Sequence, residues 1–424
     1  MKPLAIEGSI DIAYIPQIVI HKSGVVSMAL EQTWRWFGPR DPVTLKEIKQ
    51  TGASGIVTAL HQIPIGEVWP VQEILQRKGL VEAEGFTWSV AESIPVHENI
   101  KKRTGNYQKL IENYTQSIRN LGQCGVYTVC YNFMPVLDWS RTDLQVEFKD
   151  GSITTKFESN VFAAFDLFVL KRPGAEQHYA DDQIRNARAY FQKLDEIQKN
   201  RLIQTILLGF PGSGEAYTLE QFSEAINQYK DIGENELREH LHAFIKEIVP
   251  AAEESGVFMA LHPDDPPWPL LGLPRIVSSM DNVENLLKVV DSPSNGITFC
   301  TGSFGASAKN NVVEMAQRFS PRINFVHMRN VSRNDHGDFL EDNHLEGDVD
   351  MFGVMKAMIL EQKRREKQGA KNSRIPFRPD HGHLMLADRL KPEVYPGYSL
   401  FGRMRALAEL RGLEIGIERS LESR

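Results

Sequence analysis

An acid and two histidines follow a short apolar run near the C-terminal end of the chain. Residues 375–379 read Ile-Pro-Phe-Arg-Pro, and Asp380, His381 and His383 come soon after them. Carboxylate and imidazole side chains at the exit of a strand act as metal ligands or as acids and bases, and they contribute little to packing. This segment is therefore the first candidate for a functional site, with Asp380 at its centre.

Three earlier runs end in residues of the same chemical kind. His262, Cys300 and His327 each follow directly on a short, largely apolar run, and with Asp380 they are separated by 38, 27 and 53 residues, about one strand-and-helix repeat each. Side chains alternate along a strand, so each of these residues shares a face with the residue two positions before it. Adjacent barrel strands lie about 5 Å apart, so four side chains at equivalent heights can reach one point.

Two imidazoles, a thiolate and a carboxylate together form a donor set for a divalent metal ion. Any one of these residues alone is more often structural, but four of them at successive strand ends are hard to obtain by chance. We predict a metal site formed by His262, Cys300, His327 and Asp380. The thiolate favours Zn(II) or Fe(II), whereas imidazole and carboxylate also suit Mn(II), Co(II) or Ni(II). A catalytic ion must keep one coordination position open for substrate or water.

Further polar residues stand at or near the other strand ends. His61, Glu92 and Asn132 end the second, third and fourth expected strands and are candidates for binding substrate hydroxyls. Arg329 follows His327 by two residues and could clamp a substrate carboxylate, with a structural salt bridge as the alternative. Tyr395 stands in a loop that two prolines and a glycine restrict, and it is a candidate acid or base, with a packing tyrosine as the alternative.

The elements that must position these residues are read from alternating apolar and amphipathic stretches. The expected strands cover residues 33–38, 55–60, 86–91, 126–132, 257–261, 296–299, 323–326 and the run from 375. The expected helices cover residues 71–84, 107–121, 235–255, 283–290, 312–319, 351–368 and 400–410, and another helix starts at Asp41-Pro42. Strands that alternate with helices are parallel, and eight of them close a barrel. No G-x-G-x-x-G motif follows the first strand, which disfavours a dinucleotide-binding fold.

The predicted fold class is therefore α/β, a (β/α)₈ TIM barrel with a helical insertion after the fourth strand. The insertion covers about residues 138–235 and includes a hairpin-like piece at 145–155. We expect residues 28–424 to form a single barrel domain that includes the insertion. Residues 1–27 precede the regular pattern and carry no cleavage site of a signal peptide. We expect them to form an N-terminal extension outside the barrel or to arise from an upstream start codon.

Composition excludes several classes of protein. The chain has 424 residues, a formal net charge of −7 and no apolar run long enough to cross a membrane. An acidic balance argues against a nucleic-acid or anionic-membrane partner. The three cysteines form no disulfide framework and no C-x-x-C pair, which is typical of a reducing compartment, so we expect a cytoplasmic protein. Cys124 and Cys130 lie among apolar residues and are interpreted as core residues.

Several motifs carry a resemblance to a known family. They are TWRWFGP at 33–39, NFMPVLDW at 132–139, HPDDPP at 262–267, CTGS at 300–303 and RPDHGH at 378–383. With them, the chain from about residue 28 to its end resembles the mannonate dehydratase family. The resemblance implies a metal-dependent barrel related to the xylose-isomerase-like sugar enzymes. It also implies dehydration of D-mannonate to 2-keto-3-deoxy-D-gluconate, a step of hexuronate breakdown.

The resemblance further implies roles for individual residues. The metal ligands of the family, a histidine, a cysteine, a histidine and an aspartate, match the four residues predicted above, and family members are described with Mn(II) or Fe(II). The acid/base candidates of the family match His381 and Tyr395. The sequence does not divide the two roles between them. His383 has no chemical role in this scheme and is interpreted as structural. We also expect a homo-oligomer, a dimer.

Two rival functions stay open at this point. Another metal-dependent barrel enzyme acting on sugars, an isomerase or epimerase, would need the same metal and proton transfers but would release no water. A non-catalytic protein that binds a metal or a sugar acid would account for the ligands but leave the acid/base pair without a purpose. The mass of the product distinguishes the first rival, and measured turnover distinguishes the second.

Overall fold

The computed structural model describes residues 30–208, 217–391 and 393–422. The expected extension at 1–27 lies outside the described residues. Eight parallel strands close into a barrel in the order β1-β12-β9-β8-β7-β4-β3-β2. They are β1 (Glu31–Arg35), β2 (Gly55–Thr58), β3 (Thr87–Glu92), β4 (Thr128–Tyr131), β7 (Phe258–Leu261), β8 (Asn295–Cys300), β9 (Ile323–Met328) and β12 (Pro376–Pro379). The predicted (β/α)₈ barrel is confirmed.

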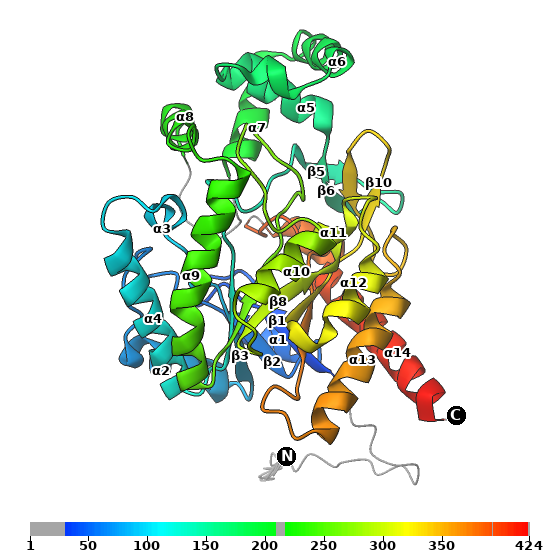
Figure 1. Ribbon diagram of the computed structural model, residues 1–424. Coiled ribbons are helices and arrows are strands. Elements are labelled where there is room, and N and C mark those ends of the chain that lie inside the picture. Colours follow the sequence, from blue (N-terminus) through cyan, green and yellow to red (C-terminus); the bar gives the residue numbers. More distant parts are fainter. Residues whose placement is uncertain (1–29, 209–216, 392, 423–424) are drawn as a thin grey trace, which may run out of the picture.

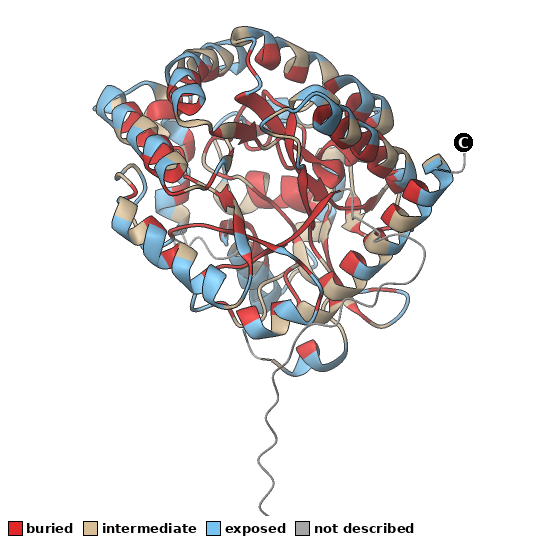
Figure 2. Cartoon of the chain, turned by 90° about the horizontal axis from the view of Figure 1, so that it is seen from below, coloured by how far each residue is buried: buried red, intermediate tan, exposed pale blue. Residues whose placement is uncertain are grey.

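Helices surround the barrel, and Figure 2 shows their buried faces turned toward the strands and their exposed faces turned outward. The outer ring contains α1 (Leu45–Lys49), α2 (Val71–Ala83), α3 (Glu98–Lys102), α4 (Tyr107–Gln123), α9 (Glu234–Ser255), α10 (Met280–Val289), α12 (Val312–Phe319), α13 (Met351–Lys367) and α14 (Leu400–Glu422). Side-chain caps at Ser279, Asn311 and Asp350 begin α10, α12 and α13. The last helix runs twelve residues beyond its expected end at Leu410, because Ile417 and Leu421 continue its apolar stripe onto the core.

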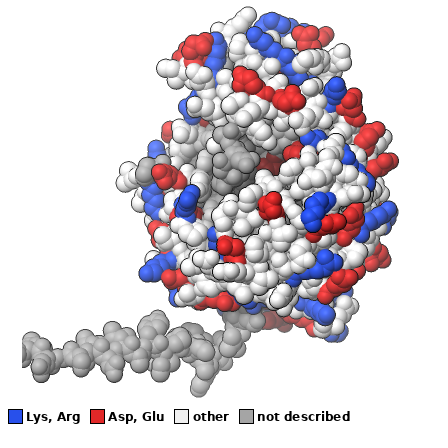
Figure 3. All heavy atoms as spheres, turned by 90° about the vertical axis from the view of Figure 1, so that its left-hand side faces the viewer, with Lys and Arg blue, Asp and Glu red and all other residues white. Residues whose placement is uncertain are grey.

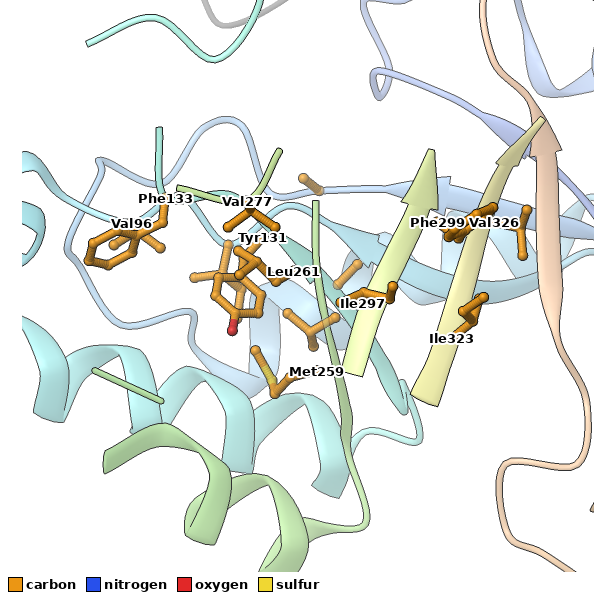
Figure 4. Packing of buried hydrophobic residues seen from close by; sticks show 14 of the residues in the cluster. Val96, Tyr131, Phe133, Met259, Leu261, Val277, Ile297, Phe299, Ile323 and Val326 are labelled. Atoms are coloured by element: carbon orange, nitrogen blue, oxygen red, sulfur yellow. The ribbon is translucent and has the colours of Figure 1, made fainter. Parts of the chain in front are cut away.

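Alternation along the strands separates two layers of packing. Outward side chains such as Met259, Leu261, Ile297 and Phe299 pack against the helices (Figure 4). Inward side chains fill the barrel with a second, small cluster of buried residues, which consists of Val57, Val90, Cys130, Ala260 and Phe325. Because the barrel interior is packed, chemistry is confined to the carboxyl ends of the strands. Ala260 and Phe325 lie two residues before His262 and His327, so those histidines continue the inward face.

The insertion stands above the carboxyl end of the barrel in Figure 1. Its hairpin, β5 (Asp143–Glu147) and β6 (Ile153–Phe157), pairs with β11 (Phe339–Glu341) and β10 (Val331–Arg333) in a separate four-stranded sheet of order β10-β11-β6-β5. Its helices are α5 (Ser159–Ala164), α6 (Asp181–Phe191), α7 (Glu196–Leu207) and α8 (Leu219–Asn227). A π-helical turn covers Phe165–Leu170, 3₁₀ turns cover Ala175–His178, Ser320–Arg322 and Leu386–Leu390, and the short helix α11 (Thr301–Gly305) follows β8. The expected hairpin is present, but its pairing with 331–341 was not predicted.

Candidate metal centre and active site

Strand register brings the four predicted ligands to one level of the barrel. Cys300 and His327 are directly opposed in the pairing of β8 with β9. Asp380 follows β12, and its N–H donates to the Met328 carbonyl on β9 at 2.8 Å. His262 follows β7 in the same way, with its N–H donating to the Tyr131 carbonyl on β4 at 2.7 Å. Four strand ends that follow one another in the chain therefore present their side chains at one point.

The ligand atoms of His262, Cys300 and His327 all lie within 4.8 Å of one another. His262 Nε2 is 3.2 Å from His327 Nδ1. Asp380 Oδ2 is 3.7 Å from the same His327 Nδ1 and 3.8 Å from Cys300 Sγ. The thiol and the carboxylate are buried with the His327 ring. The four residues thus gather two nitrogens, a sulfur and an oxygen in a space of the size that one cation occupies.

The outer contacts of the two histidines fit a metal ion. His262 Nδ1 faces the Pro263 carbonyl at 2.7 Å, which leaves the Nε2 lone pair for a cation. His327 Nε2 faces the carboxylate of Glu92 at 3.6 Å without a hydrogen-bond partner of its own, and its Nδ1 faces the other ligands. Carbonyl and carboxylate groups behind ligating histidines fix the ring orientation and raise ligand basicity. The donor set and its surroundings therefore fit a divalent metal.

The thiol and the carboxylate of this cluster are also supported from behind. Ser303 Oγ donates to Cys300 Sγ at 3.1 Å, and Arg329 Nη1 lies 4.0 Å from the same sulfur. Burial opposes ionisation of Asp380, but the positive charge of Arg378, together with those of His381, His327 and Arg329, holds the pKa of Asp380 well below its usual range. Arg378 donates to this carboxylate directly. Asp380 is thus an anionic candidate ligand at neutral pH.

His381 lies beside the ligand cluster in a strained backbone conformation. Its φ of +60° is in the left-handed region, which is uncommon outside glycine. Its Nδ1 is 3.2 Å from Glu341 Oε1, and its Nε2 is 3.9 Å from Asp380 Oδ1. The Tyr398 ring meets it edge-on at 5.5 Å. On its other side a Cβ added to Gly397 would lie 3.1 Å from ring atom Cδ2. The imidazole is therefore enclosed on several sides and held in one orientation.

Glu341 belongs to a buried network of two arginines and two acids. Its carboxylate accepts from Arg141 Nη2 at 2.5 Å and from Arg329 Nη2 at 2.7 Å. Asp265 binds the same two arginines, with Arg141 Nη1 at 3.1 Å. Burial disfavours the Glu341 carboxylate, yet Arg329, His381 and Arg141 hold its pKa well below the usual range. Glu341 therefore keeps a negative charge behind His381.

Arg329 occupies a different place from the one expected of a substrate clamp. Its guanidinium donates to Glu341 and to Asp265, and it does not line the cavity beside the ligand cluster. The alternative left open in the sequence, a structural salt bridge, matches this geometry. Arg35 and Arg378 line that cavity in its place. Arginine type and strand-end position alone do not separate the two roles, because a guanidinium binds protein and substrate carboxylates equally well.

The three candidates for binding hydroxyls divide between the cavity and its surroundings. Glu92 and Asn132 line the cavity with the ligand cluster. Glu92 accepts hydrogen bonds from Nη2 and Nε of Arg378, at 2.9 and 3.1 Å, and Asn132 donates to Asp138 at 3.2 Å. His61 is exposed and does not line this cavity. Two of the three are therefore placed to meet a bound molecule.

Two adjoining cavities share Asp380 and His381 in their walls. The metal-side cavity, of about 50 Å³, is lined by the ligand histidines and by Arg35, Asn132, Trp139 and Tyr398. The hairpin-side cavity, of about 150 Å³, is lined by Tyr395, Glu341, His344 and Thr155. The predicted acid/base pair is thus split: His381 faces both cavities, and Tyr395 faces only the second. Burial, with the charges of Asp41 and Glu393, raises the pKa of Tyr395.

Sequence reasoning missed four residues of the site, namely Arg35, Trp139, Glu341 and Tyr398. Arg35 ends a strand and Tyr398 stands in a Pro-Gly-Tyr turn after the last strand, so position alone could have found them. Trp139 and Glu341 come from the start of the insertion and from β11. No local pattern marks either of them. The pairing of β6 with β11, which brings the insertion next to Glu341, joins segments far apart in the chain.

Two further observations concern the surface and membranes. Lys and Arg side chains are interspersed with Asp and Glu on the face that Figure 3 shows, without a continuous basic area on that face. Among the described residues, every helix is too short or too polar to span a bilayer.

Comparisons with known proteins agree with these features. A family model described as D-mannonate dehydratase (UxuA) matches residues 30–424. Proteins named mannonate dehydratase from a Marinomonas strain and from Chromohalobacter salexigens are 55% and 53% identical to the chain over 92% of its length, covering 100% and 99% of their own.

A solved structure extends the likeness to three dimensions. The crystal structure of mannonate dehydratase from Streptococcus suis serotype 2 is similar with a TM-score of 0.72 and 36% identity, covering 93% of this chain and 95% of that one. Sequence and structure are matched over nearly the whole length of both proteins. The chain belongs to the D-mannonate dehydratase family.

Proposed function

We propose that this enzyme removes water from D-mannonate and forms 2-keto-3-deoxy-D-gluconate, in the breakdown of hexuronates. The observation that carries the proposal is the meeting of His262, Cys300 and His327 ligand atoms within 4.8 Å, beside a cavity that both histidines line together with His381. A family of hydro-lyases matches the whole described barrel. A sugar acid brings a carboxylate and adjacent hydroxyls, the groups that a metal centre with an open position binds.

The metal in this proposal is Mn(II) or Fe(II), held by His262, Cys300, His327 and Asp380. One thiolate among nitrogen and oxygen donors is compatible with Fe(II), and imidazole with carboxylate also suits Mn(II). The chemistry that such an ion supplies when bound is Lewis-acid stabilisation of the negative charge that develops as C2 loses its proton.

The protein itself must move two protons. A base takes the proton from C2, an acid gives a proton to the hydroxyl on C3, the C3–O bond breaks, and the enol that forms becomes the ketone with release of one water. We assign the base to His381, because Glu341 at 3.2 Å from Nδ1 leaves Nε2 as the accepting atom. We assign the acid to Tyr395, because its hydroxyl is protonated at neutral pH and it lines the hairpin-side cavity with Asp380 and His381.

The remaining candidates bind and orient in this scheme. Asn132 and Glu92 face the metal-side cavity and meet substrate hydroxyls. Arg329 acts through its neighbours, since it holds Glu341 behind His381 and lies 4.0 Å from the Cys300 sulfur. We assign no substrate contact to His61, which is exposed and outside that cavity.

The decisive experiment incubates anaerobically purified enzyme with D-mannonate and Mn(II), Fe(II), Co(II) or Zn(II). The expected product is a 2-keto-3-deoxy acid whose mass is lower than that of D-mannonate by one water. A product of unchanged mass would instead identify an isomerase or epimerase. Absence of any product with all four metals would exclude the dehydratase.

Three finer proposals concern the protein as a whole. We propose a homodimer, which light scattering after gel filtration tests. We place the enzyme in the cytoplasm, supported by the three free cysteines, and cell fractionation tests this location. We also propose that residues 28–424 are one barrel domain and that 1–27 is an extension. A chain that begins at Met28 is then expected to keep the full turnover and thermal stability.

A further inference from the structure

The indole of Trp139 carries a buried hydrogen-bond donor without a partner in the structure. The side chain is 4% exposed, and its Nε1 has no acceptor within hydrogen-bond distance among the described residues. A buried donor left unpaired costs about 1–3 kcal/mol, and most such groups in native proteins are paired. Trp139 lines the metal-side cavity together with His262, His327 and Asp380. The donor is therefore unsatisfied at the place where the reaction is proposed to occur.

The Trp139 ring is held in place from two directions. The Arg141 guanidinium lies over it, with Cζ at 4.6 Å from the ring centroid. That arginine is itself fixed by Asp265 and Glu341. The His381 ring lies nearly perpendicular to the indole, with 84° between the ring planes and 6.1 Å between the ring centroids. A cation over the face and a perpendicular imidazole leave the indole little freedom to turn toward another acceptor.

A second tryptophan, Trp34, serves as a comparison because it is buried away from the metal-side cavity. Trp34 also has a buried Nε1 without a partner, but its ring packs against Arg403 at 4.2 Å and does not line the metal-side cavity. An indole N–H donates and cannot accept. Of these two tryptophans, only Trp139 lines a polar cavity in which a ligand can lie.

We propose that the Trp139 N–H donates a hydrogen bond to a hydroxyl of the bound sugar acid and so helps to select a polyhydroxylated substrate. The proposal rests on the proposed function, because it takes the sugar acid as the occupant of the metal-side cavity. It assigns to the first residues of the insertion a part in substrate recognition. Trp139 contacts a hydroxyl and moves no proton, so it is a specificity-determining residue.

The test compares Trp139→Phe with the matched change Trp34→Phe in the full-length, metal-loaded enzyme. Phenylalanine keeps an aromatic ring beneath the arginine and removes the N–H. Loss of one hydrogen bond is expected to raise KM for D-mannonate, and the Kd of the non-reacting 3-deoxy analogue in calorimetry, about tenfold. Trp34→Phe is expected to change both by less than about twofold. Metal content and melting temperature confirm that both variants are folded.

Analogues locate the hydroxyl without relying on a variant alone. Wild-type enzyme is titrated with D-mannonate analogues that lack the hydroxyl on C4, C5 or C6. One of them is expected to bind about tenfold more weakly than the parent acid. Trp139→Phe is expected to bind that analogue and the parent acid with similar affinity, because the donor and the acceptor have then both been removed.

The outcomes separate the two proposals. In one outcome, wild type turns over D-mannonate normally, and wild type and Trp139→Phe bind the sugar acid with equal affinity. This result overturns the role of Trp139 and leaves the proposed dehydration unaffected. In a second outcome, wild type binds the sugar acid without releasing water, and Trp139→Phe binds it more weakly. This result supports the Trp139 contact and overturns the proposed reaction. Failure of metal-loaded wild type to bind any of these acids overturns both.

Discussion

Nδ1 of His381 lies 3.2 Å from Oε1 of Glu341, although the two residues belong to different parts of the fold. His381 follows a strand of the barrel, and Glu341 ends β11 of the four-stranded sheet that contains the insertion hairpin. The insertion therefore supports the candidate catalytic residue, because its hairpin pairs with the strand that carries Glu341. A carboxylate behind an imidazole fixes its tautomer and its orientation.

Glu341→Gln is expected to lower kcat about 10- to 100-fold, because His381, the proposed base, is then no longer held in its reactive orientation. KM is expected to change little, because the residues that contact the substrate remain. It also removes a charge that pairs Arg141 and Arg329, so the free energy of unfolding is expected to fall by about 3–5 kcal/mol. Glu361→Gln is the matched control, because that buried acid also accepts from two arginines, Arg364 and Arg365, but on α13. Steady-state kinetics and denaturation separate the effects. An unchanged kcat in Glu341→Gln contradicts the positioning role.

Stability is expected to fall in acid through Asp265. Burial opposes its charge, but Arg141 and Arg329 lower the pKa of Asp265 from 3.8 to about 2. As the pH falls, the unfolded chain binds this proton first, so the contribution is complete above about pH 4 and is lost as the pH falls toward about 2. It amounts to about 2 kcal/mol.

Melting temperatures of chelator-treated enzyme between pH 6 and pH 2 measure this loss, with chelator used because metal binding has a pH dependence of its own. Asp265→Asn is expected to be less stable at neutral pH and to lose less stability than wild type on acidification. If the melting temperatures of the two proteins fall equally as the pH is lowered, the ionisation of Asp265 does not contribute to this loss of stability.

Gly397→Ala is expected to impair turnover through the His381 ring. A Cβ at this position would lie 3.1 Å from ring atom Cδ2, and the φ of +79° strains any residue but glycine. Gly369 has a φ of +65° with nothing within 4 Å of a built Cβ. Both substitutions should therefore cost about 1 kcal/mol of stability, and only Gly397→Ala should also lower kcat. Equal kcat values in the two variants would exclude a role for this contact.

The strand ends of the site could be predicted from sequence because local patterns determine them. Apolar runs mark β7, β8 and β9, and alternation places His262, Cys300 and His327 on the inward face two residues beyond a packed position. Counting eight such runs gives the barrel, and the barrel brings consecutive strand ends together. The four residues that meet at one point were therefore all named in advance.

The surroundings of the ligands could not be predicted, for three physical reasons. Glu341 and Arg141 reach the site through pairing of β6 with β11, which joins segments far apart in the chain. Arg329 has the residue type of a substrate clamp and the geometry of an internal ion pair, and the type alone does not distinguish them. The exposure of His61 depends on how the loop after β2 leaves the barrel, and no periodic pattern records that.

Tyr395→Phe is expected to lower kcat by about 10²–10⁴ with metal still bound, because the proton for the leaving hydroxyl is then missing. Tyr398 offers a direct comparison. It is buried in the wall of the metal-side cavity and meets the His381 ring at 5.5 Å. Turnover and metal content are measured for both Phe variants. If Tyr398→Phe abolishes turnover while Tyr395→Phe keeps it, the acid is Tyr398 and the assignment made above is wrong.

Cys300→Ser tests the thiolate as a metal ligand. The sulfur lies within the ligand cluster and accepts from Ser303, and serine keeps the shape of the side chain but offers a weaker, protonated oxygen. Affinity for Mn(II) and Fe(II) is expected to fall at least about 100-fold, which lowers the stabilisation by a given metal concentration by up to about 2.7 kcal/mol. The metal-induced rise in melting temperature should shrink accordingly.

Cys124→Ser is the control for this experiment, because Cys124 is also buried but caps the end of α4, away from the ligands. It should bind metal as wild type does and show the same rise in melting temperature. Elemental analysis after dialysis and thermal denaturation with and without metal give two independent readings, neither of which depends on turnover. Full metal content in Cys300→Ser, with an unchanged thermal shift, would remove the thiolate from the site and leave His262, His327 and Asp380 as its protein ligands, the two-histidine, one-carboxylate set of many Fe(II) enzymes.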